Sequence, residues 1–241
     1  MIESSSNKLF KNIIKLKQKK YRDKFGYYYI ETEKLVKEAM KSSCNIIFVI
    51  LREDREDFDT LNFEKKVFSN TLFKKMSELK NPDGVGAIIK IKESKNNFGN
   101  RIILLDNIQD PGNAGTIIRS SEAFGFSDVL IYNDGVDLYN LKTLRASMGS
   151  AFRVNVRDVN LNDVVELKNK YKLYASDMGG KDVSSLKISE TFILAVGNEA
   201  NGLSDEIIKL SDSIISIPMK GKIESLNAAV AASILMHELN Q

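Results

Sequence analysis

The fold is decided by the stretch Ile217-Pro-Met-Lys-Gly-Lys-Ile-Glu-Ser-Leu-Asn-Ala-Ala-Val-Ala-Ala-Ser-Ile-Leu235, in which an apolar strand is followed by a helix rich in small residues. The strand is predicted at residues 214–217, and Pro218 ends it because proline has no N–H to donate. From Ser225 onward the apolar residues have helical spacing, and serine is a favourable N-cap residue. We therefore expect Ser225 and Asn227 where free backbone N–H groups converge, either at a ligand site or as an ordinary helix cap.

The second half of the chain alternates apolar strands with amphipathic helices. The remaining strands are predicted at residues 101–105, 129–131, 152–156, 173–176 and 192–196. The helices are predicted at residues 114–124, 141–148, 161–170 and 205–210. This alternation predicts an α/β fold, a mostly parallel sheet with helices on both faces. Ligands of such sheets bind beyond the carboxyl ends of the strands.

The first half predicts a smaller α/β domain at residues 1–92. Its strands are expected at residues 27–30, 45–51, 67–68 and 86–92, and its helices at residues 31–40 and 70–79. Residues 93–100 are polar, contain glycine and show no periodicity, so we interpret them as a flexible linker. The second domain is then residues 101–241.

Composition excludes several classes of protein. The chain has 241 residues, of which 43% are hydrophobic, enough for two domains with cores. Its one cysteine, Cys44, excludes an internal disulfide, and no Cys/His cluster is present to bind a metal. The only histidine, His237, is near the end of the last predicted helix, which leaves no Ser-His-Asp or Cys-His chemistry. The sequence shows neither a signal peptide nor a membrane-spanning run, so we expect a cytoplasmic protein.

The net charge of +3 conceals an asymmetry between the two halves. Residues 1–100 hold 21 basic and 14 acidic residues, whereas residues 101–241 hold 14 and 18. The basic excess is densest near the start, at Lys8, Lys11, Lys15, Lys17, Lys19, Lys20, Arg22 and Lys24. With tyrosines close by, this cluster suits phosphate contacts and base stacking. A solvated helix face is the alternative interpretation.

Three polar loops that contain glycine follow predicted strands. They are residues 106–115, residues 197–202 and the stretch after Ile217. None of them carries a GxGxxG or GxxxxGK[ST] fingerprint, which disfavours a dinucleotide enzyme or a nucleoside triphosphatase.

These loops resemble the three motifs of the SpoU (TrmH-like) RNA ribose 2′-O-methyltransferases, a branch of the SPOUT superfamily. The motifs are, in order, Asn107-x-x-Asp-Pro-x-Asn-x-Gly-x-x-x-Arg119, Gly197-Asn-Glu-x-x-Gly-Leu-Ser204, and Ile217-Pro-Met with Ser225-Leu-Asn227. Their order and spacing agree with the family over the whole second half. The first half is similar to the family's L30e-like substrate-binding domain, but Thr32 replaces the glycine of its F-x-x-E-G signature.

The resemblance implies S-adenosylmethionine as the cofactor and a trefoil knot formed by the chain from about residue 192 to its end. The adenine of the cofactor would contact backbone groups around Gly197, Ile217, Met219 and Leu226. No metal is implied.

The resemblance also implies five catalytic residues, Arg119, Asn113, Glu199, Ser225 and Asn227. Arg119 would bind substrate phosphate and stabilise the developing alkoxide, because its guanidinium stays protonated; the alternative is that it acts as the base. Asn113 would orient Arg119 or the ribose, or only form a turn. Glu199, expected in a buried loop, would hold the arginine, a backbone turn or the substrate; the alternative is a surface carboxylate. Ser225 and Asn227 would close the site against cofactor and ribose.

Ribosomal RNA is the expected substrate, because a two-domain layout resembles the ribosomal enzymes more than the compact transfer-RNA enzymes. A transfer-RNA 2′-O-methyltransferase, a base methyltransferase of the same superfamily and a non-catalytic RNA-binding protein are the alternatives. We also expect a homodimer formed through the second domain, by helix packing beside the knot. The first domain would then be free to reach outwards on its linker.

Overall fold

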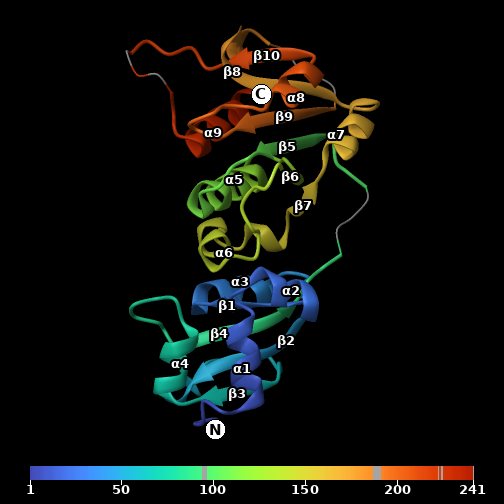
Figure 1. Cartoon of the computed structure of the whole chain (residues 1–241). Coiled ribbons are helices and arrows are strands. Elements are labelled where there is room, and N and C mark those ends of the chain that lie inside the picture. The colour runs from blue at the N-terminus through green and yellow to red at the C-terminus, as the bar shows by residue number, and fades with distance from the viewer. Residues whose placement is uncertain (94–96, 187–190, 222, 224, 241) are drawn as a thin grey trace.

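Two sheets, each with its own helices, lie one above the other along the long axis of the molecule (Figure 1). The computed structural model describes residues 1–93, 97–186, 191–221, 223 and 225–240. The N-terminus lies at the end of this axis that the first domain occupies.

The first domain is built on a mixed four-stranded sheet in the order β1-β4-β2-β3. β4 pairs antiparallel with both β1 and β2, and β3 is parallel to β2. The strands are β1 (Tyr27–Glu31), β2 (Ile46–Arg52), β3 (Lys65–Phe68) and β4 (Val85–Lys90). The helices are α1 (Lys8–Lys15), α2 (Lys19–Phe25), α3 (Glu33–Lys41) and α4 (Asn70–Met76), with a 3₁₀ turn η1 (Glu53–Arg55). β4 occupies a central position because nearly all of its residues are apolar and buried.

The second domain contains a six-stranded sheet in the order β10-β8-β9-β5-β6-β7, and every pair in it is parallel. The strands are β5 (Arg101–Asp106), β6 (Asp128–Tyr132), β7 (Asn155–Val159), β8 (Lys172–Asp182), β9 (Phe192–Gly197) and β10 (Ser213–Ser216). The helices are α5 (Pro111–Ala123), α6 (Leu141–Ser147), α7 (Leu161–Lys168), α8 (Asp205–Leu210) and α9 (Ala228–Glu238), with 3₁₀ turns η2 (Ser150–Phe152) and η3 (Val183–Ser185). The predicted α/β fold with a parallel sheet is confirmed.

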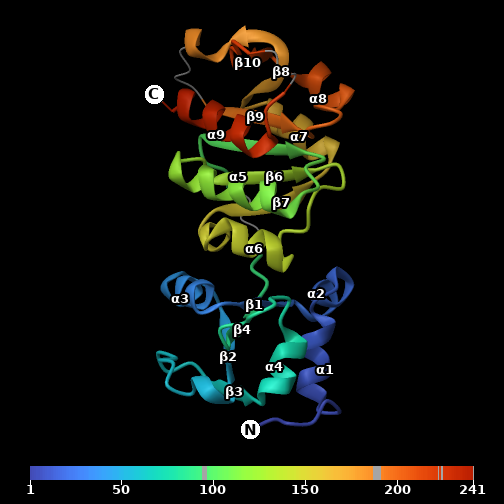
Figure 2. The same cartoon turned by 90° about the vertical axis from the view of Figure 1, so that its left-hand side faces the viewer.

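The central strand β5 is buried on both faces, as its continuous apolar run requires. Ile103 and Leu105 pack in the core cluster that includes α5 and α9. Ile102 and Leu104 point the other way, into the cluster that includes α7 and α8. Figure 2 shows α5 and α9 side by side on one face of this sheet, where the Ser120 and Ser233 hydroxyls lie 2.8 Å apart.

Several details differ from the sequence prediction, and three of them concern the second domain. Asn227, and not Ser225, is the N-cap of α9, and its side chain accepts from two backbone N–H groups. Phe152 belongs to a 3₁₀ turn, so the strand predicted at 152–156 begins only at Asn155. β8 continues to Asp182, six residues beyond its predicted end, and its polar outer part pairs with β10 after a register shift. The part of the chain predicted to form the knot includes the connection from β10 to α9. Residues 222 and 224 of this connection lie outside the described residues.

The end of the predicted linker is fastened to the second domain. The Phe98 ring lies 4.3 Å from the Arg157 guanidinium, and the Gly99 N–H donates to Asp128 at 2.9 Å. Residues 94–96 of this linker lie outside the described residues. The expectation of a freely reaching first domain was wrong, because ion pairs join the two domains, including Glu31 with Arg145 at 2.8 Å.

No helix in the described ranges is long and apolar enough to cross a membrane. Within the same ranges, no three His, Cys, Asp or Glu side chains come together to form a metal site. Cys44 is a free, half-buried thiol. Burial raises its pKa, which lowers its reactivity as a nucleophile.

Thr32, which replaces a signature glycine, adopts a backbone conformation that suits glycine. Its φ of 93° and ψ of 136° lie where a β-branched residue is strained. Thr32 is also the N-cap of α3, since its Oγ1 accepts from the Leu35 N–H at 3.3 Å. The hydroxyl therefore offsets part of the cost of the strained backbone.

We predict that Thr32→Gly increases the free energy of unfolding by about 1 kcal/mol, because relief of strain exceeds the weak cap that is removed. Thr32→Ala, which removes the cap and keeps the strain, should decrease it by about 1 kcal/mol. Urea titration followed by circular dichroism measures both changes. A glycine variant less stable than the parent protein would contradict this account of Thr32.

Candidate active site

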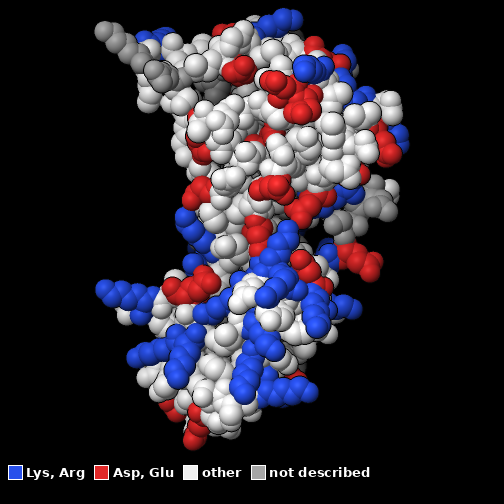
Figure 3. All heavy atoms as spheres, in the orientation of Figure 1, with Lys and Arg blue, Asp and Glu red and all other residues white. Residues whose placement is uncertain are grey.

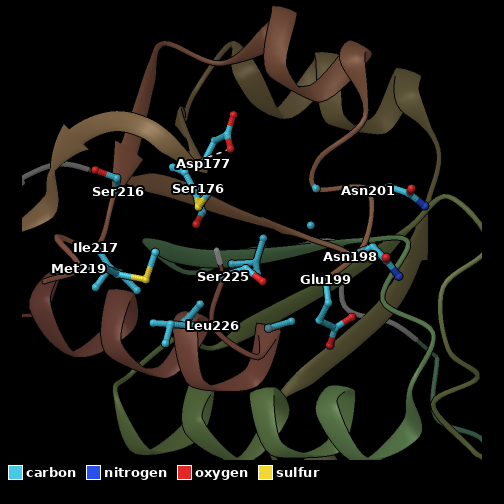
Figure 4. Close-up of a pocket in the computed structure, with 16 residues that line it drawn as sticks. Ser176, Asp177, Asn198, Glu199, Asn201, Ser216, Ile217, Met219, Ser225 and Leu226 are labelled. Carbon is cyan, nitrogen blue, oxygen red and sulfur yellow. Dashed lines mark hydrogen bonds between the residues drawn. The ribbon is translucent and has the colours of Figure 1, made fainter. Parts of the chain in front are cut away.

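A cavity of about 300 Å³ opens at the carboxyl ends of β9 and β10 and beside the middle of β8, at Ser176, Asp177 and Met178. It is lined by the turn after β9, the segment after β10 and the start of α9 (Figure 4). Ile217, Met219 and Leu226 form an apolar side, and Asn198, Glu199 and Asn201 lie opposite. The cavity includes all four residues predicted to surround the cofactor, Gly197, Ile217, Met219 and Leu226.

The turn after β9 is closed tightly on itself. The backbones of Asn198 and Gly202 exchange two hydrogen bonds, of 3.1 and 2.8 Å. A Cβ at Gly197 would overlap the Gly202 backbone, so only glycine permits this approach. Gly202 has a φ of 69°, in the left-handed region. The turn therefore holds Glu199 at a fixed place beside the cavity.

Asp106, at the end of β5, fastens the far side of the same turn. Its side chain is 1% exposed, and its Oδ2 accepts from both the N–H and the hydroxyl of Ser204, each at 2.7 Å. Asn198 adds a second connection by donating from its amide to the Asn107 carbonyl at 3.1 Å. The loops that follow β5 and β9 are thus joined through buried or half-buried polar contacts.

Three of the predicted catalytic residues, one from each motif, form a hydrogen-bonded chain. Asn113, in the first turn of α5, donates from its amide nitrogen to the carboxylate of Glu199. Asn227, the cap of α9, donates to the Asn113 oxygen at 3.0 Å. Both the nitrogen and the oxygen of the Asn113 amide are therefore hydrogen-bonded, which fixes the orientation of the side chain. Glu199 is exposed to solvent, which contradicts the expectation of a buried carboxylate.

Asp110 caps the helix that carries Asn113. Its Oδ1 accepts from the Asn113 N–H at 2.9 Å, and its Oδ2 lies 2.9 Å from the Lys142 ammonium. The hydrogen bond from Lys142, with a smaller contribution from the Asn113 N–H, lowers the pKa of this carboxyl. Asp110 is therefore ionised near neutral pH and stabilises the positive end of α5.

The other two predicted catalytic residues lie apart from this chain. Ser225 lines the cavity, but it forms no cap. Arg119 lies in α5 beyond Asn113, does not line the cavity and is exposed. Within the described ranges no side chain pairs with its guanidinium, so it is available to a substrate. Among the described residues, the side chains of Asn113 and Glu199 are hydrogen-bonded to each other, and neither is hydrogen-bonded to Arg119.

Sequence reasoning missed Asp106 and the pair Ser176 and Asp177. The pair lines the cavity opposite Leu226 (Figure 4). Ser176 is the last residue of a strand predicted at 173–176, so the rule that ligands bind beyond the carboxyl ends of strands would have found both. Asp106 also ends a strand, although its contact with Ser204 depends on the tertiary fold.

Comparison with known proteins agrees with this geometry. Residues 100–237 match the model of the SpoU rRNA Methylase family, and residues 7–87 match that of the MRM3-like substrate binding domain. A relative from Bacillus subtilis (strain 168), the 23S rRNA (guanosine(2553)-2′-O)-methyltransferase RlmP, is 35% identical over 244 residues. The match covers 99% of this chain and 98% of RlmP.

Solved structures match both domains together. The SpoU methyltransferase AviRb from Streptomyces viridochromogenes, in complex with AdoMet, has a TM-score of 0.88 and 25% identity over 97% of each chain. An AdoMet-bound rRNA methyltransferase from Sinorhizobium meliloti has a TM-score of 0.87 and 27% identity, covering 99% of this chain and 96% of that one. On the sequence match over more than half its length and on its fold, the chain belongs to the SpoU rRNA methylase family.

Proposed function

We propose that this protein transfers a methyl group from S-adenosylmethionine to a ribose 2′-hydroxyl of ribosomal RNA. The observation that carries the proposal is the full-length similarity to RlmP, together with the chain of Glu199, Asn113 and Asn227 beside the cavity. Transfer of radioactive methyl groups to unmodified ribosomal RNA, with mass-spectrometric mapping of the product, tests it. Methylation of a base rather than a ribose would contradict it.

The cavity suits S-adenosylmethionine in size and chemistry. Its apolar side, at Ile217, Met219 and Leu226, would hold the adenine ring against side chains and backbone groups. Glu199 and Asp177 place carboxylates on the lining, which favours a ligand with a positive sulfonium. When bound, the cofactor supplies an electrophilic methyl group.

The residues of the chain would position the ribose and stabilise charge. Glu199, held by the Asn113 amide, can accept a hydrogen bond from a ribose hydroxyl. Arg119, unpaired among the described residues, can bind a substrate phosphate and stabilise the alkoxide as the 2′-hydroxyl loses its proton. Ser225 lies at the cavity between Glu199 and the apolar side that includes Ile217 and Met219 (Figure 4). Positioning and electrostatics can supply most of the rate acceleration.

The first domain would bind the RNA. Lysines and arginines gather on the face of this domain seen in Figure 3. Five exposed members of the predicted cluster form what we call the α1–α2 surface, Lys8, Lys11, Lys15, Lys20 and Lys24. The Tyr21 ring lies 5.6 Å from the Lys15 ammonium and 4.9 Å from that of Lys20, a combination that suits stacked bases and phosphates.

Three other residues of the predicted cluster contact the protein itself. Arg22 is 4% exposed and pairs with Asp137 of the second domain, so its inclusion in an RNA-binding cluster was wrong. Lys17 donates to the Lys75 carbonyl at 3.3 Å, and Lys19 lies 3.6 Å from Asp158.

A homodimer through the second domain is part of the proposal. Apolar side chains at the start of α9 and before it remain exposed, with Val230 at 48% and Ile223 at 65%. Such residues near the cavity favour a contact with a second copy, which would cover them.

We predict that Arg119→Ala decreases the rate of methyl transfer by about 100-fold or more, as expected when an interaction with the transition state is removed. The dissociation constant for S-adenosylmethionine, measured by calorimetry, should stay within about threefold, because Arg119 does not line the cavity. Lys209→Ala, an exposed cation on α8, is the matched control and should change neither quantity. A parallel decrease of cofactor affinity in Arg119→Ala would contradict the assignment.

For the α1–α2 surface, we predict that replacing Lys8, Lys11, Lys15 and Lys20 with Gln weakens RNA binding. It should also decrease the slope of log K against log salt by up to about three to four units, close to one for each phosphate that is no longer neutralised. Filter binding over a range of salt concentrations measures the slope. Replacing Lys34, Lys41, Lys65 and Lys80 in the same domain controls for net charge. Equal slopes in the two quadruple variants would show that the α1–α2 surface does not bind the RNA.

For the dimer, we predict that Val230→Glu converts the protein to a monomer, because the interface would then bury an unpaired carboxylate. Light scattering at micromolar concentration measures the mass of both proteins. Val165→Glu, at an exposed valine on α7, is the control and should remain dimeric. A parent protein that is monomeric at this concentration would refute the dimer.

A further inference from the structure

The core of the first domain is completed by residues of the second. Leu144 of α6 and Phe152 of η2 are buried in the apolar cluster built from β1, α3, β2 and β4. Leu141 of α6 is buried in the other first-domain cluster, which includes α1 and α4. The Tyr28 and Tyr139 rings lie 4.5 Å apart across the same boundary. This interface is apolar and continuous with the core of the first domain, so the two domains are not joined by a flexible linker alone.

Two of the ion pairs that cross the interface have a buried first-domain member. Glu31 is 1% exposed and accepts from the Arg145 guanidinium at 2.8 Å. Arg22 pairs with Asp137 and also donates to the Leu16 carbonyl at 2.7 Å. Burial raises the pKa of Glu31, which shows the cost of desolvating this carboxylate. Pairs of this kind are sensitive to geometry, because a displaced partner leaves a buried charge uncompensated.

The backbone of the second domain also approaches a first-domain side chain closely at one point. Gly149, between α6 and η2, has a φ of 96°, and a Cβ there would lie 2.8 Å from the Cβ of Glu38 in α3. Arg153 donates to Glu38 at 2.9 Å and also pairs with Glu122 in α5. The space between α3 and the second domain is therefore filled, and a side chain at Gly149 would act as a wedge.

The segment that contacts the first domain also positions the catalytic helix. A Cβ at Gly115 of α5 would lie 2.5 Å from the Thr143 carbonyl oxygen of α6, so the two helices touch through backbone. Lys142 of α6 pairs with Asp110, the cap of α5. Glu122, at the other end of α5, pairs with Arg153. α6 and the turn after it thus connect the first domain to the helix that carries Asn113 and Arg119.

We infer that Arg145, Asp137 and Gly149 determine which nucleotide is methylated, by fixing the position of the α1–α2 surface relative to the cavity. The inference rests on the proposed function and deepens it. An RNA bound to a fixed surface presents one ribose to the cavity, whereas a tethered domain would present many. Arg145, Asp137 and Gly149 act through the position of the first domain and are positioning residues, since none of them lines the cavity.

Gly149→Ala, with a matched control, tests this inference on the full-length protein. Gly125→Ala is the control, because Gly125 has a φ of 74° and its nearest neighbour to a new Cβ is 4.0 Å away. Both substitutions strain a left-handed backbone, and only Gly149→Ala inserts a wedge. Arg145→Ala, compared with the conservative Arg145→Lys, provides a second, independent disruption.

Two measurements are made on each variant. Spin labels at Glu56→Cys and Val165→Cys, in a Cys44→Ser background, report the distance between the domains by pulsed electron resonance. Methyl transfer to unmodified ribosomal RNA is mapped by mass spectrometry, and the dissociation constant for S-adenosylmethionine is measured alongside.

In Gly149→Ala and Arg145→Ala we expect a broadened distance distribution and about a tenfold or greater decrease of methylation at the normal nucleotide, with methyl groups appearing at others. Affinity for the cofactor should stay within about twofold, and Gly125→Ala and Arg145→Lys should resemble the parent. Unchanged selectivity in a variant with separated domains would overturn the inference, as would an unchanged distance distribution in both variants. A parent protein that methylates no ribosomal RNA would instead refute the proposed function.

Discussion

The structure depends on the close approach of α5 and α6 at Gly115. No side chain larger than glycine fits there, because the α6 backbone occupies the space. α5 presents Asn113 to the turn after β9, and α6 presents its apolar residues to the first domain. One backbone contact therefore relates the proposed catalytic groups to the domain that we propose binds RNA. Close-packed interiors transmit displacements of their elements. A shift of α5 or α6 would therefore change both the position of Asn113 at the turn after β9 and the contact with the first domain.

Most of the fold could be predicted because its signals are local. The apolar run of residues 101–105 and the alternation around it indicated a parallel sheet, and β5 lies in the middle of that sheet. Boundaries failed where the tertiary fold decides them. Asn227 caps α9 although Ser225 is equally suitable by residue type, because the position of the first helical turn is set by packing. β8 extends through polar residues because β10 supplies a partner, which no pattern in residues 177–182 reveals.

The candidate site was predictable to the extent that its motifs fix backbone turns. Glu199, Asn113 and Asn227 come together as the motif resemblance suggested, although the exposure of Glu199 did not follow from the apolar strand before it. The resemblance could not reveal that Arg119 lies outside the cavity, because residue spacing gives no side-chain direction. Arg22 was misjudged for a related reason. A basic residue within a lysine cluster was assumed to be exposed, and only the other domain supplies the carboxylate that buries it.

The shared core has a consequence for synthesis of the protein on the ribosome. The strands of the first domain are complete by Lys90, but Leu141, Leu144 and Phe152, which complete its apolar clusters, follow only in the second domain. At a synthesis rate of about 5–20 residues per second, part of the apolar surface of the nascent first domain remains uncovered for several seconds. During that interval it is exposed to chaperones and to other nascent chains. Folding of the first domain is thus completed only when part of the catalytic domain has been made.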